Sequence, residues 1–187
     1  MSKRLFDISL SITLCCVLLP IIVLTYFLVR VTSSGPGIYW SMRVGKNNQL
    51  FSMPKFRSMR KDTPALATHL LQNPQSFLSP IGSFIRKTSL DELPQLWSIL
   101  KGDMSFVGPR PALFNQDDLI AKRTELGIEG LTPGLTGWAQ INGRDELDIT
   151  TKVELDYDYL KRKSFRFDLY ILWCTARKVI SSDGVKH

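Results

Sequence analysis

The residues best placed for chemistry are the adjacent carboxylates Asp91 and Glu92, which follow two basic residues, Arg86 and Lys87. Apolar residues at helical spacing from Leu90 onward predict a helix that begins near residue 90. Both carboxylates then lie in its first turn, where free N–H groups and the helix dipole favour anions. A carboxylate kept ionised there can act as a nucleophile while its neighbour holds a divalent cation against phosphate oxygens. Oxygen ligands and a phosphate-bearing substrate would suit Mg²⁺.

The same residues also have a purely structural interpretation. Ser89 and Glu92 have the spacing of a capping box. In that register Pro94 would be the fifth helical residue, where its missing N–H is needed. With Asp91 as the N-cap, Pro94 moves to the third position, where no intrahelical donor is required. Taken alone, the segment favours capping over catalysis.

Further residues could bind a phosphate or a nucleotide. Arg110 lies between two prolines, so the backbone holds its guanidinium ready for bidentate phosphate binding. Lys55 and Arg57 share one face of a predicted strand, and Arg86 stands just upstream of the carboxylates. A third group in a Gly- and Pro-rich loop could contact a base or a sugar: Gln140, Asn142 and Arg144. Taken alone, Arg110 is more commonly an incidental arginine in a surface turn, and Lys55 and Arg57 could also belong to a solvated strand face.

The composition restricts the class of protein. With 187 residues and 44% hydrophobic content, the chain can form one compact domain and a membrane element. Its net charge of +7 suits an anionic partner such as lipid headgroups, a phosphorylated substrate or nucleic acid. Three cysteines and two histidines have neither disulfide-framework nor zinc-site spacing. The phosphate-binding and dinucleotide-binding glycine motifs do not occur, which argues against ordinary kinases and dinucleotide enzymes.

An uncharged apolar run from Ile8 to Val29 predicts a membrane element. As one helix it would be roughly 33 Å long, enough to cross a hydrocarbon core of about 30 Å. Pro20 interrupts it near the middle, and basic residues stand on both sides, at Lys3 and Arg4 before it and from Arg30 after it. The positive-inside rule then favours a helix–break–helix that enters and leaves the same leaflet. A kinked span is the alternative.

The predicted fold class is α+β and mainly helical, with a re-entrant membrane element in residues 1–32 and a cytosolic catalytic domain in residues 33–187. Apolar segments on either side of Gly45–Asn48 predict a small antiparallel β-hairpin. Two late amphipathic helices, one around Val153–Leu160 and one around Phe167–Ile180, combine apolar residues with basic ones. Their composition fits helices in the headgroup region of a membrane, although core helices would also fit.

Four strings resemble the bacterial sugar transferases in their small monotopic phosphoglycosyl transferase form. They are KRLFD (Lys3–Asp7), KFRSM (Lys55–Met59), RKTSLDELPQLWSILKGDMSFVGPRP (Arg86–Pro111) and PGLTGWAQINGR (Pro133–Arg144). The order and spacing of the Asp-Glu-Leu-Pro-Gln and Gly-Pro-Arg-Pro strings make the resemblance specific, and it extends to about Arg177. It reverses the structural interpretation of the two carboxylates.

The resemblance implies transfer of a phosphosugar from a UDP-sugar to polyprenyl (undecaprenyl) phosphate, an early membrane step of glycoconjugate assembly. Asp91 would attack the β-phosphorus, release UMP and carry the phosphosugar until polyprenyl phosphate accepts it. Glu92 would hold Mg²⁺, and Lys55, Arg57 and Arg110 would bind phosphates. The enzyme would lie at the cytoplasmic face of the inner membrane, with the two substrates and membrane lipids as partners and no nucleic acid.

Two positions depart from the family pattern, and other functions stay open. Leu19 stands where a serine is expected before Pro20, and Ile149 stands where a tryptophan is usual. The other functions are a non-enzymatic scaffold of a glycan-assembly complex, a membrane-tethered nucleic-acid binder and a magnesium-dependent phosphatase of lipid diphosphates. The intact carboxylate pair and Arg110 argue against a scaffold, and release of UMP would distinguish a transferase from a phosphatase.

Overall fold

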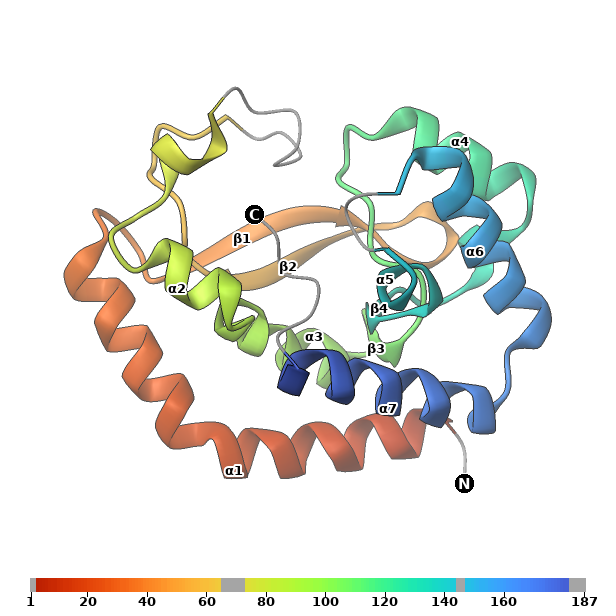
Figure 1. Ribbon diagram of the computed structural model, residues 1–187, viewed down its shortest axis with the longest axis horizontal. Helices are drawn as coiled ribbons and strands as arrows, with labels where there is room; N and C mark the ends of the chain where they lie inside the picture. The colour runs from red at the N-terminus through yellow and green to blue at the C-terminus, as the bar shows by residue number, and fades with distance from the viewer. Residues whose placement is uncertain (1–2, 65–72, 144–146, 182–187) are drawn as a thin grey trace.

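The computed structural model, shown in Figure 1, describes residues 3–64, 73–143 and 147–181. The architecture is mainly helical, as predicted, and the described residues form two small strand pairs, of which only the first was predicted. The helices and strands are α1 (Lys3–Thr32), β1 (Ile38–Val44), β2 (Leu50–Phe56), α2 (Gly82–Lys87), α3 (Leu96–Lys101), β3 (Ser105–Val107), α4 (Asp117–Glu125), β4 (Gly134–Thr136), α5 (Trp138–Ile141), α6 (Ile149–Arg162) and α7 (Phe165–Ser181). Short 3₁₀ turns are η1 (Lys46–Asn48), η3 (Pro74–Phe77), η4 (Leu90–Gln95) and η5 (Ile128–Gly130).

The long helix α1 runs along one side of the molecule and is bent between its two halves (Figure 1). It is helical throughout Lys3–Thr32, with Pro20 inside, and proline bends a helix because it lacks an N–H and clashes with the preceding turn. The predicted interruption is therefore a bend within one continuous helix. By length and composition α1 could cross a membrane, and most of its apolar side chains are exposed.

Both ends of α1 pack on the rest of the chain. Near the N-terminal end, Asp7 and Ser11 are buried, and near the C-terminal end Thr25 and Val29 are buried. Val29 belongs to a small apolar cluster with Phe56 of β2 and Ile85 of α2. The main core brings together apolar side chains from β2 through to α7, and Leu10, Leu14 and Cys15 of α1 pack against it.

The predicted hairpin is confirmed. Strands β1 and β2 pair antiparallel, with Ile38 opposite Phe56 and Val44 opposite Leu50. The turn between them contains Asn47 and Asn48, both with positive φ, a conformation that asparagine tolerates better than most residues. Strand β2 ends at Phe56, so the prediction that it continues beyond that residue is wrong.

A second strand pair joins a short strand after α3 to the Gly- and Pro-rich segment that the sequence predicted as a loop. Strands β3 and β4 pair in parallel, and α5 follows β4 directly. The pairing needs glycines, because a Cβ on Gly108 would lie 2.3 Å from the Thr132 carbonyl oxygen and one on Gly134 would lie 2.1 Å from the Gly108 nitrogen. These close approaches bring the turn after β3 against the turn before β4.

The two late helices are confirmed as α6 and α7. Asp148 caps α6, since its carboxylate accepts a hydrogen bond of 2.7 Å from the Thr151 N–H. Helix α7 begins at Phe165 and runs past the N-terminal half of α1 in Figure 1. Their N-terminal ends touch, because the rings of Phe6 and Phe165 meet edge to face with centroids 5.3 Å apart.

Candidate active site

Asp91 and Glu92 lie in η4, a 3₁₀ turn that leads into α3. The helix predicted from residue 90 is therefore present, and it ends at Gly102, whose φ of 99° suits glycine. Ser89 precedes the turn with a φ of 56°, and its side chain makes no capping hydrogen bond. Neither carboxylate caps the helix, so both capping interpretations are wrong. The side chains are available for other contacts.

Glu92 joins three segments of the chain that are distant in sequence. Its Oε1 atom accepts hydrogen bonds of 3.0 Å from Lys55 Nζ on β2 and 3.0 Å from Arg110 Nη2 in the turn after β3. The Glu92 and Lys55 side chains are only 13% and 15% exposed. We call Lys55, Asp91, Glu92 and Arg110 the carboxylate cluster. Three of the predicted site segments thus meet at one place.

Asp91 differs from its neighbour because its carboxylate is buried without a hydrogen bond to any residue that the structure describes. It is 8% exposed. Its pKa is raised to about 6, mainly by burial; the nearby Glu92 contributes to the rise, while Lys55, Arg86 and Arg110 oppose it. Burial also lowers the pKa of Lys55, although Glu92 opposes that shift. Asp91 is therefore ionised at neutral pH and held near several cations.

The turn that carries Arg110 is fixed by hydrogen bonds to its backbone. The Gly108 N–H donates to the Thr136 carbonyl oxygen at 2.9 Å. The carbonyl oxygens of residues 107, 109, 110 and 111 accept hydrogen bonds from Lys3 Nζ, Gly134 N, Arg123 Nη1 and Arg43 Nη1. The backbone of this turn is thus held at several points, and the Arg110 guanidinium itself donates to Glu92.

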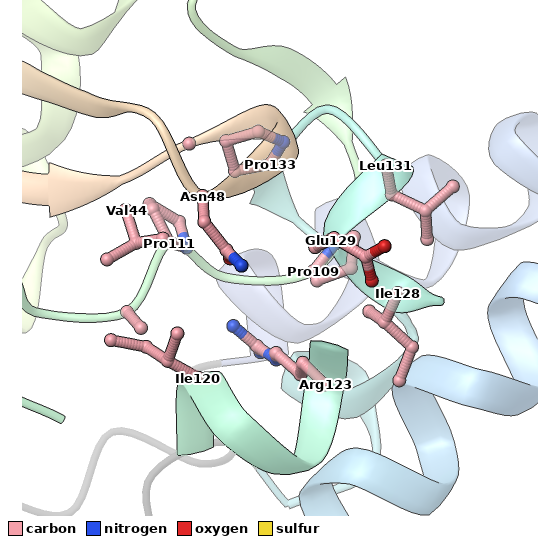
Figure 2. A pocket seen from close by; sticks show the side chains of 12 residues that line it. Val44, Asn48, Pro109, Pro111, Ile120, Arg123, Ile128, Glu129, Leu131 and Pro133 are labelled. Atoms are coloured by element: carbon pink, nitrogen blue, oxygen red, sulfur yellow. The ribbon is translucent and has the colours of Figure 1, made fainter. Parts of the chain in front are cut away.

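Behind this turn lies a small cavity, shown in Figure 2. Its volume of about 30 Å³ is room for roughly one water molecule. Pro109 and Pro111 line it on one side, and Arg123 and Glu129 reach it from α4 and η5. Neither Asp91 nor Glu92 lines this cavity. The cavity lies against the turn, and no residue of the carboxylate cluster lines it.

Arg123 connects this turn to α6. Its Nε and Nη2 atoms donate to Asp156 Oδ2 at 3.0 and 2.5 Å, and both side chains are buried. Sequence reasoning missed this pair. The only signal was an aspartate on the apolar side of a predicted amphipathic helix, between Val153 and Tyr159.

The other predicted site residues lie in different surroundings. Arg57 donates through Nε to the Pro36 carbonyl oxygen at 2.9 Å and lies over the Tyr39 ring. Arg86, in the last turn of α2, acts on Asp91 through its charge.

The predicted base- or sugar-binding residues of the loop also have different surroundings. The Gln140 side-chain amide is buried and forms no hydrogen bond with the described residues. Asn142 is exposed and bonds the Trp138 carbonyl oxygen of its own helix at 2.8 Å. Arg144 lies outside the described residues.

A second buried charged cluster holds the N-terminal end of α1 against the domain. Lys3 Nζ donates to Asp168 Oδ2 at 2.6 Å, to the Val107 carbonyl oxygen at 2.9 Å and to the Tyr159 hydroxyl at 3.3 Å. The Tyr159 hydroxyl donates to Asp168 Oδ1 at 2.7 Å. We call Lys3, Tyr159 and Asp168 the anchor cluster. Burial raises the pKa of Tyr159, and the Asp168 carboxylate raises it further.

Two neighbours extend this attachment. Asp7 Oδ1 accepts a hydrogen bond of 3.2 Å from the Phe106 N–H, and Arg4 donates to the Ile99 and Leu100 carbonyl oxygens in the last turn of α3. From their charge, the sequence analysis used Lys3 and Arg4 only to predict how the apolar segment enters the membrane. Lys3, Arg4 and Asp7 all lie in the KRLFD string, but the spacing of these residues does not predict a contact with β3.

The acidic residues of the carboxylate cluster would suit a magnesium ion only in combination with a phosphate ligand. Among the described residues, no group of three His, Cys, Asp or Glu side chains could form a protein-only metal site. Glu92 is already shared by two cations, while Asp91 forms no hydrogen bond in the described parts of the chain. This donor set fits Mg²⁺ bound by one or two carboxylates together with substrate phosphates.

Comparison with known proteins finds similar sequences over nearly the whole chain. The sequence model described as bacterial sugar transferase matches residues 1–182. An uncharacterized sugar transferase of Bacillus subtilis, EpsL, is 41% identical, over 98% of this chain and 90% of its own length. The undecaprenyl-phosphate galactose phosphotransferase of Salmonella typhimurium is 38% identical over 97% of this chain, which spans only 41% of that protein. The UDP-glucose:undecaprenyl-phosphate glucose-1-phosphate transferase of Escherichia coli is 36% identical over 94% of this chain and 39% of its own length.

Proposed function

The chain belongs to the bacterial sugar transferase family, and we propose that it transfers a sugar phosphate from a UDP-sugar to polyprenyl phosphate at a membrane. The observation that carries the proposal is the contrast within the carboxylate cluster. Glu92 is held by two cations at 3.0 Å, whereas Asp91 is buried beside them with no hydrogen bond to the described residues. A buried carboxylate that lies near cations and accepts no hydrogen bond from the described residues is suited to attack a phosphorus atom.

In the proposed first step, an Asp91 oxygen attacks the β-phosphorus of the UDP-sugar. The bond from that phosphorus to the bridging oxygen breaks, UMP leaves, and the phosphosugar remains on the Asp91 carboxylate. In the second step, an oxygen of polyprenyl phosphate attacks the same phosphorus. The bond to Asp91 breaks, and the product is a polyprenyl-diphosphate-linked sugar.

Lys55 and Arg110 would stabilise the charge that develops on the phosphates during both steps. Their positions are fixed, because Lys55 lies on a paired strand and the Arg110 turn is bound at successive backbone groups. Fixed cations need no reorganisation when charge develops, which makes them effective in phosphoryl transfer. Glu92 holds both cations in place and orients them toward its neighbour.

Glu92, together with Asp91, would also bind a magnesium ion that enters with the diphosphate. Such an ion would supply additional neutralisation of phosphate charge. Because Glu92 is shared with Lys55 and Arg110, we propose that Glu92→Gln raises the magnesium concentration needed for activity. An unchanged magnesium dependence would mean that Glu92 only positions the two cations.

We further propose that α1 is re-entrant and that the domain lies at the cytoplasmic face of the inner membrane. The support is that both ends of α1 contact the same domain: Lys3 bonds β3 and α7, while Val29 packs on β2 and α2. A helix that crossed the bilayer would carry one of its ends away from that domain. Because UDP-sugars are made in the cytosol, the domain is expected on that side.

This topology can be tested with a single cysteine at Ser2, after Cys15, Cys16 and Cys174 are replaced by alanine. In intact cells an impermeant thiol reagent should label the protein only after the inner membrane is opened. Labelling in cells with an intact inner membrane would mean that α1 spans it. The matched control is a single cysteine at Asp118 in the exposed first turn of α4, which should be protected in the same cells.

The activity is tested by incubating the purified chain with undecaprenyl phosphate and a panel of radiolabelled UDP-sugars. We expect label to enter the organic phase with one of them and UMP to be released in equal amount. Release of a water-soluble sugar phosphate without lipid product would indicate a hydrolase instead. If no UDP-sugar releases UMP, the proposed reaction is wrong.

A further inference from the structure

An open hollow lies where α6 ends and α7 begins, away from the carboxylate cluster. Its volume is about 450 Å³. It is lined by Arg162, Ser164, Arg166, Phe167 and Tyr170. None of these residues belongs to the carboxylate cluster or contacts it through any bond among the described residues. The proposed transfer reaction leaves this hollow without a role.

The hollow has a basic rim and an aromatic wall. The Arg162 guanidinium lies 4.2 Å from the centre of the Phe167 ring and 5.1 Å from that of Trp138, so both rings hold it in place. The Phe167 ring stacks in turn on Tyr170, with centroids 6.3 Å apart. A guanidinium held by rings loses less conformational freedom when it binds an anion.

The acidic residues near this hollow do not neutralise it. Basic residues crowd the end of α6 and the beginning of α7: Lys161, Arg162, Lys163 and Arg166. Asp158 pairs with Arg162 at 2.9 Å, but both side chains are more than 40% exposed, and such a pair is weak. Asp168 is buried and its oxygens are bound by Lys3 and Tyr159. The surface is therefore strongly positive and suited to a phosphate.

The hollow also lies beside the membrane helix. Phe165, the first residue of α7, contacts Phe6 of α1, and Asp168 binds Lys3 of the same helix. Farther along α7, Tyr170 and Trp173 are exposed, and their rings lie 6.2 Å apart. Exposed tyrosine and tryptophan next to basic residues are typical of the headgroup level of a bilayer.

From these four features we infer that the hollow binds the phosphate of an anionic phospholipid headgroup. Arg162 and Arg166 would contact the phosphate, and Phe167 and Tyr170 would lie against the glycerol and upper acyl chains. The bound lipid would fix how α7 and the N-terminal end of α1 lie at the membrane surface. The inference requires α1 to lie in the membrane and does not depend on the proposed transfer reaction.

The test uses the full chain in nanodiscs, with exposed Trp40 and Trp97 replaced by phenylalanine so that Trp138 and Trp173 report on the hollow. Quenching by brominated phosphatidylglycerol is compared with quenching by brominated phosphatidylcholine at equal mole fraction. We expect the anionic lipid to be preferred. The Arg162→Gln/Arg166→Gln variant lacks both cations. Its preference for the anionic lipid should be about 30-fold lower, because each basic residue near the surface contributes roughly 1 kcal/mol.

Control variants separate a defined site from general charge. Lys122→Gln/Lys152→Gln removes the same charge from α4 and α6 and should keep the preference. Arg166→Gln alone spares the ring-stacked Arg162 and should reduce the preference about fivefold. An equal loss in the Lys122 and Lys152 variant, or no preference in the unmodified chain, would overturn the inference. So would full competition by millimolar inorganic phosphate, which would indicate a site for the free ion.

Discussion

The carboxylate cluster and the anchor cluster are both buried, both contain an aspartate, and both join distant segments of the chain. They differ in how completely the aspartate is bound. Asp168 has Lys3 on one oxygen and Tyr159 on the other, at 2.6 and 2.7 Å. Asp91 is similarly buried, yet none of the described residues gives its carboxylate a hydrogen bond. A saturated carboxylate stabilises a fold, whereas an unsaturated one beside fixed cations is available to a substrate.

The two clusters are expected to affect the stability of the folded protein in opposite directions. The anchor cluster satisfies its buried groups, so breaking it should destabilise the protein. In the carboxylate cluster, burial raises the pKa of Asp91 from 3.8 to about 6, so the folded state resists ionisation of this group. Ionised Asp91 therefore costs folding free energy at neutral pH. Such a cost is expected where a residue is kept for chemistry.

The largest effect is expected for Asp91→Asn. An amide cannot act as the nucleophile, so UMP release should fall about 10⁴-fold or more. The melting temperature at pH 7.5 should stay the same or rise, because the costly buried charge is gone. The control is Asp118→Asn in the exposed first turn of α4. If the activity of Asp91→Asn stayed within about tenfold of that of the unmodified chain, Asp91 would have only a structural role, as Asp168 does, and the proposed difference between the two clusters would be wrong.

The second prediction concerns Arg110→Lys, which keeps the charge but loses the planar guanidinium. We expect a loss of about 2–3 kcal/mol of transition-state stabilisation, which is roughly 30- to 150-fold in kcat/KM. Arg60→Lys, at an exposed surface ion pair, is the control and should be neutral. An unchanged rate for Arg110→Lys would show that its fixed geometry is not used.

The two clusters also show what could be predicted from the sequence. The Asp-Glu pair and the Gly-Pro-Arg-Pro turn were identifiable because short strings carry them, and the hairpin and late helices followed from local patterns. The parallel pairing of β3 with β4 was not predicted, because each strand has only three residues and their contact depends on Gly108 and Gly134. The anchor cluster was missed because Lys3 lies 165 residues from Asp168, and no local pattern encodes such a contact.

The third prediction follows from the pKa of Asp91. As the proposed nucleophile, Asp91 must be ionised, so kcat/KM should fall about tenfold for each pH unit below 6 and should be level from pH 7 to 8. The folded pKa is higher than the unfolded value of 3.8, so the stability that protonated Asp91 contributes is present at low pH and lost as the pH rises toward 6. Asp91→Asn should remove this part of the pH dependence of unfolding. A rate that is level down to pH 5 would contradict the raised pKa.

The smallest effect on chemistry is expected for Lys3→Met, which removes the ammonium from the anchor cluster while keeping an apolar chain. Asp168 then stays buried with only Tyr159, and unfolding should become easier by about 2 kcal/mol, below the usual cost for a broken buried pair because Lys3 is 28% exposed. The Arg110 turn keeps its bond to Thr136 and its bonds from Gly134, Arg123 and Arg43, so the folded enzyme should retain kcat/KM within about threefold. Adding Asp168→Asn to Lys3→Met should recover part of the stability, because the unpaired buried charge is gone. If Lys3→Met instead lowers kcat/KM as much as Arg110→Lys without loss of stability, then the N-terminal end of α1 acts on the reaction through β3, and the two clusters form one functional unit.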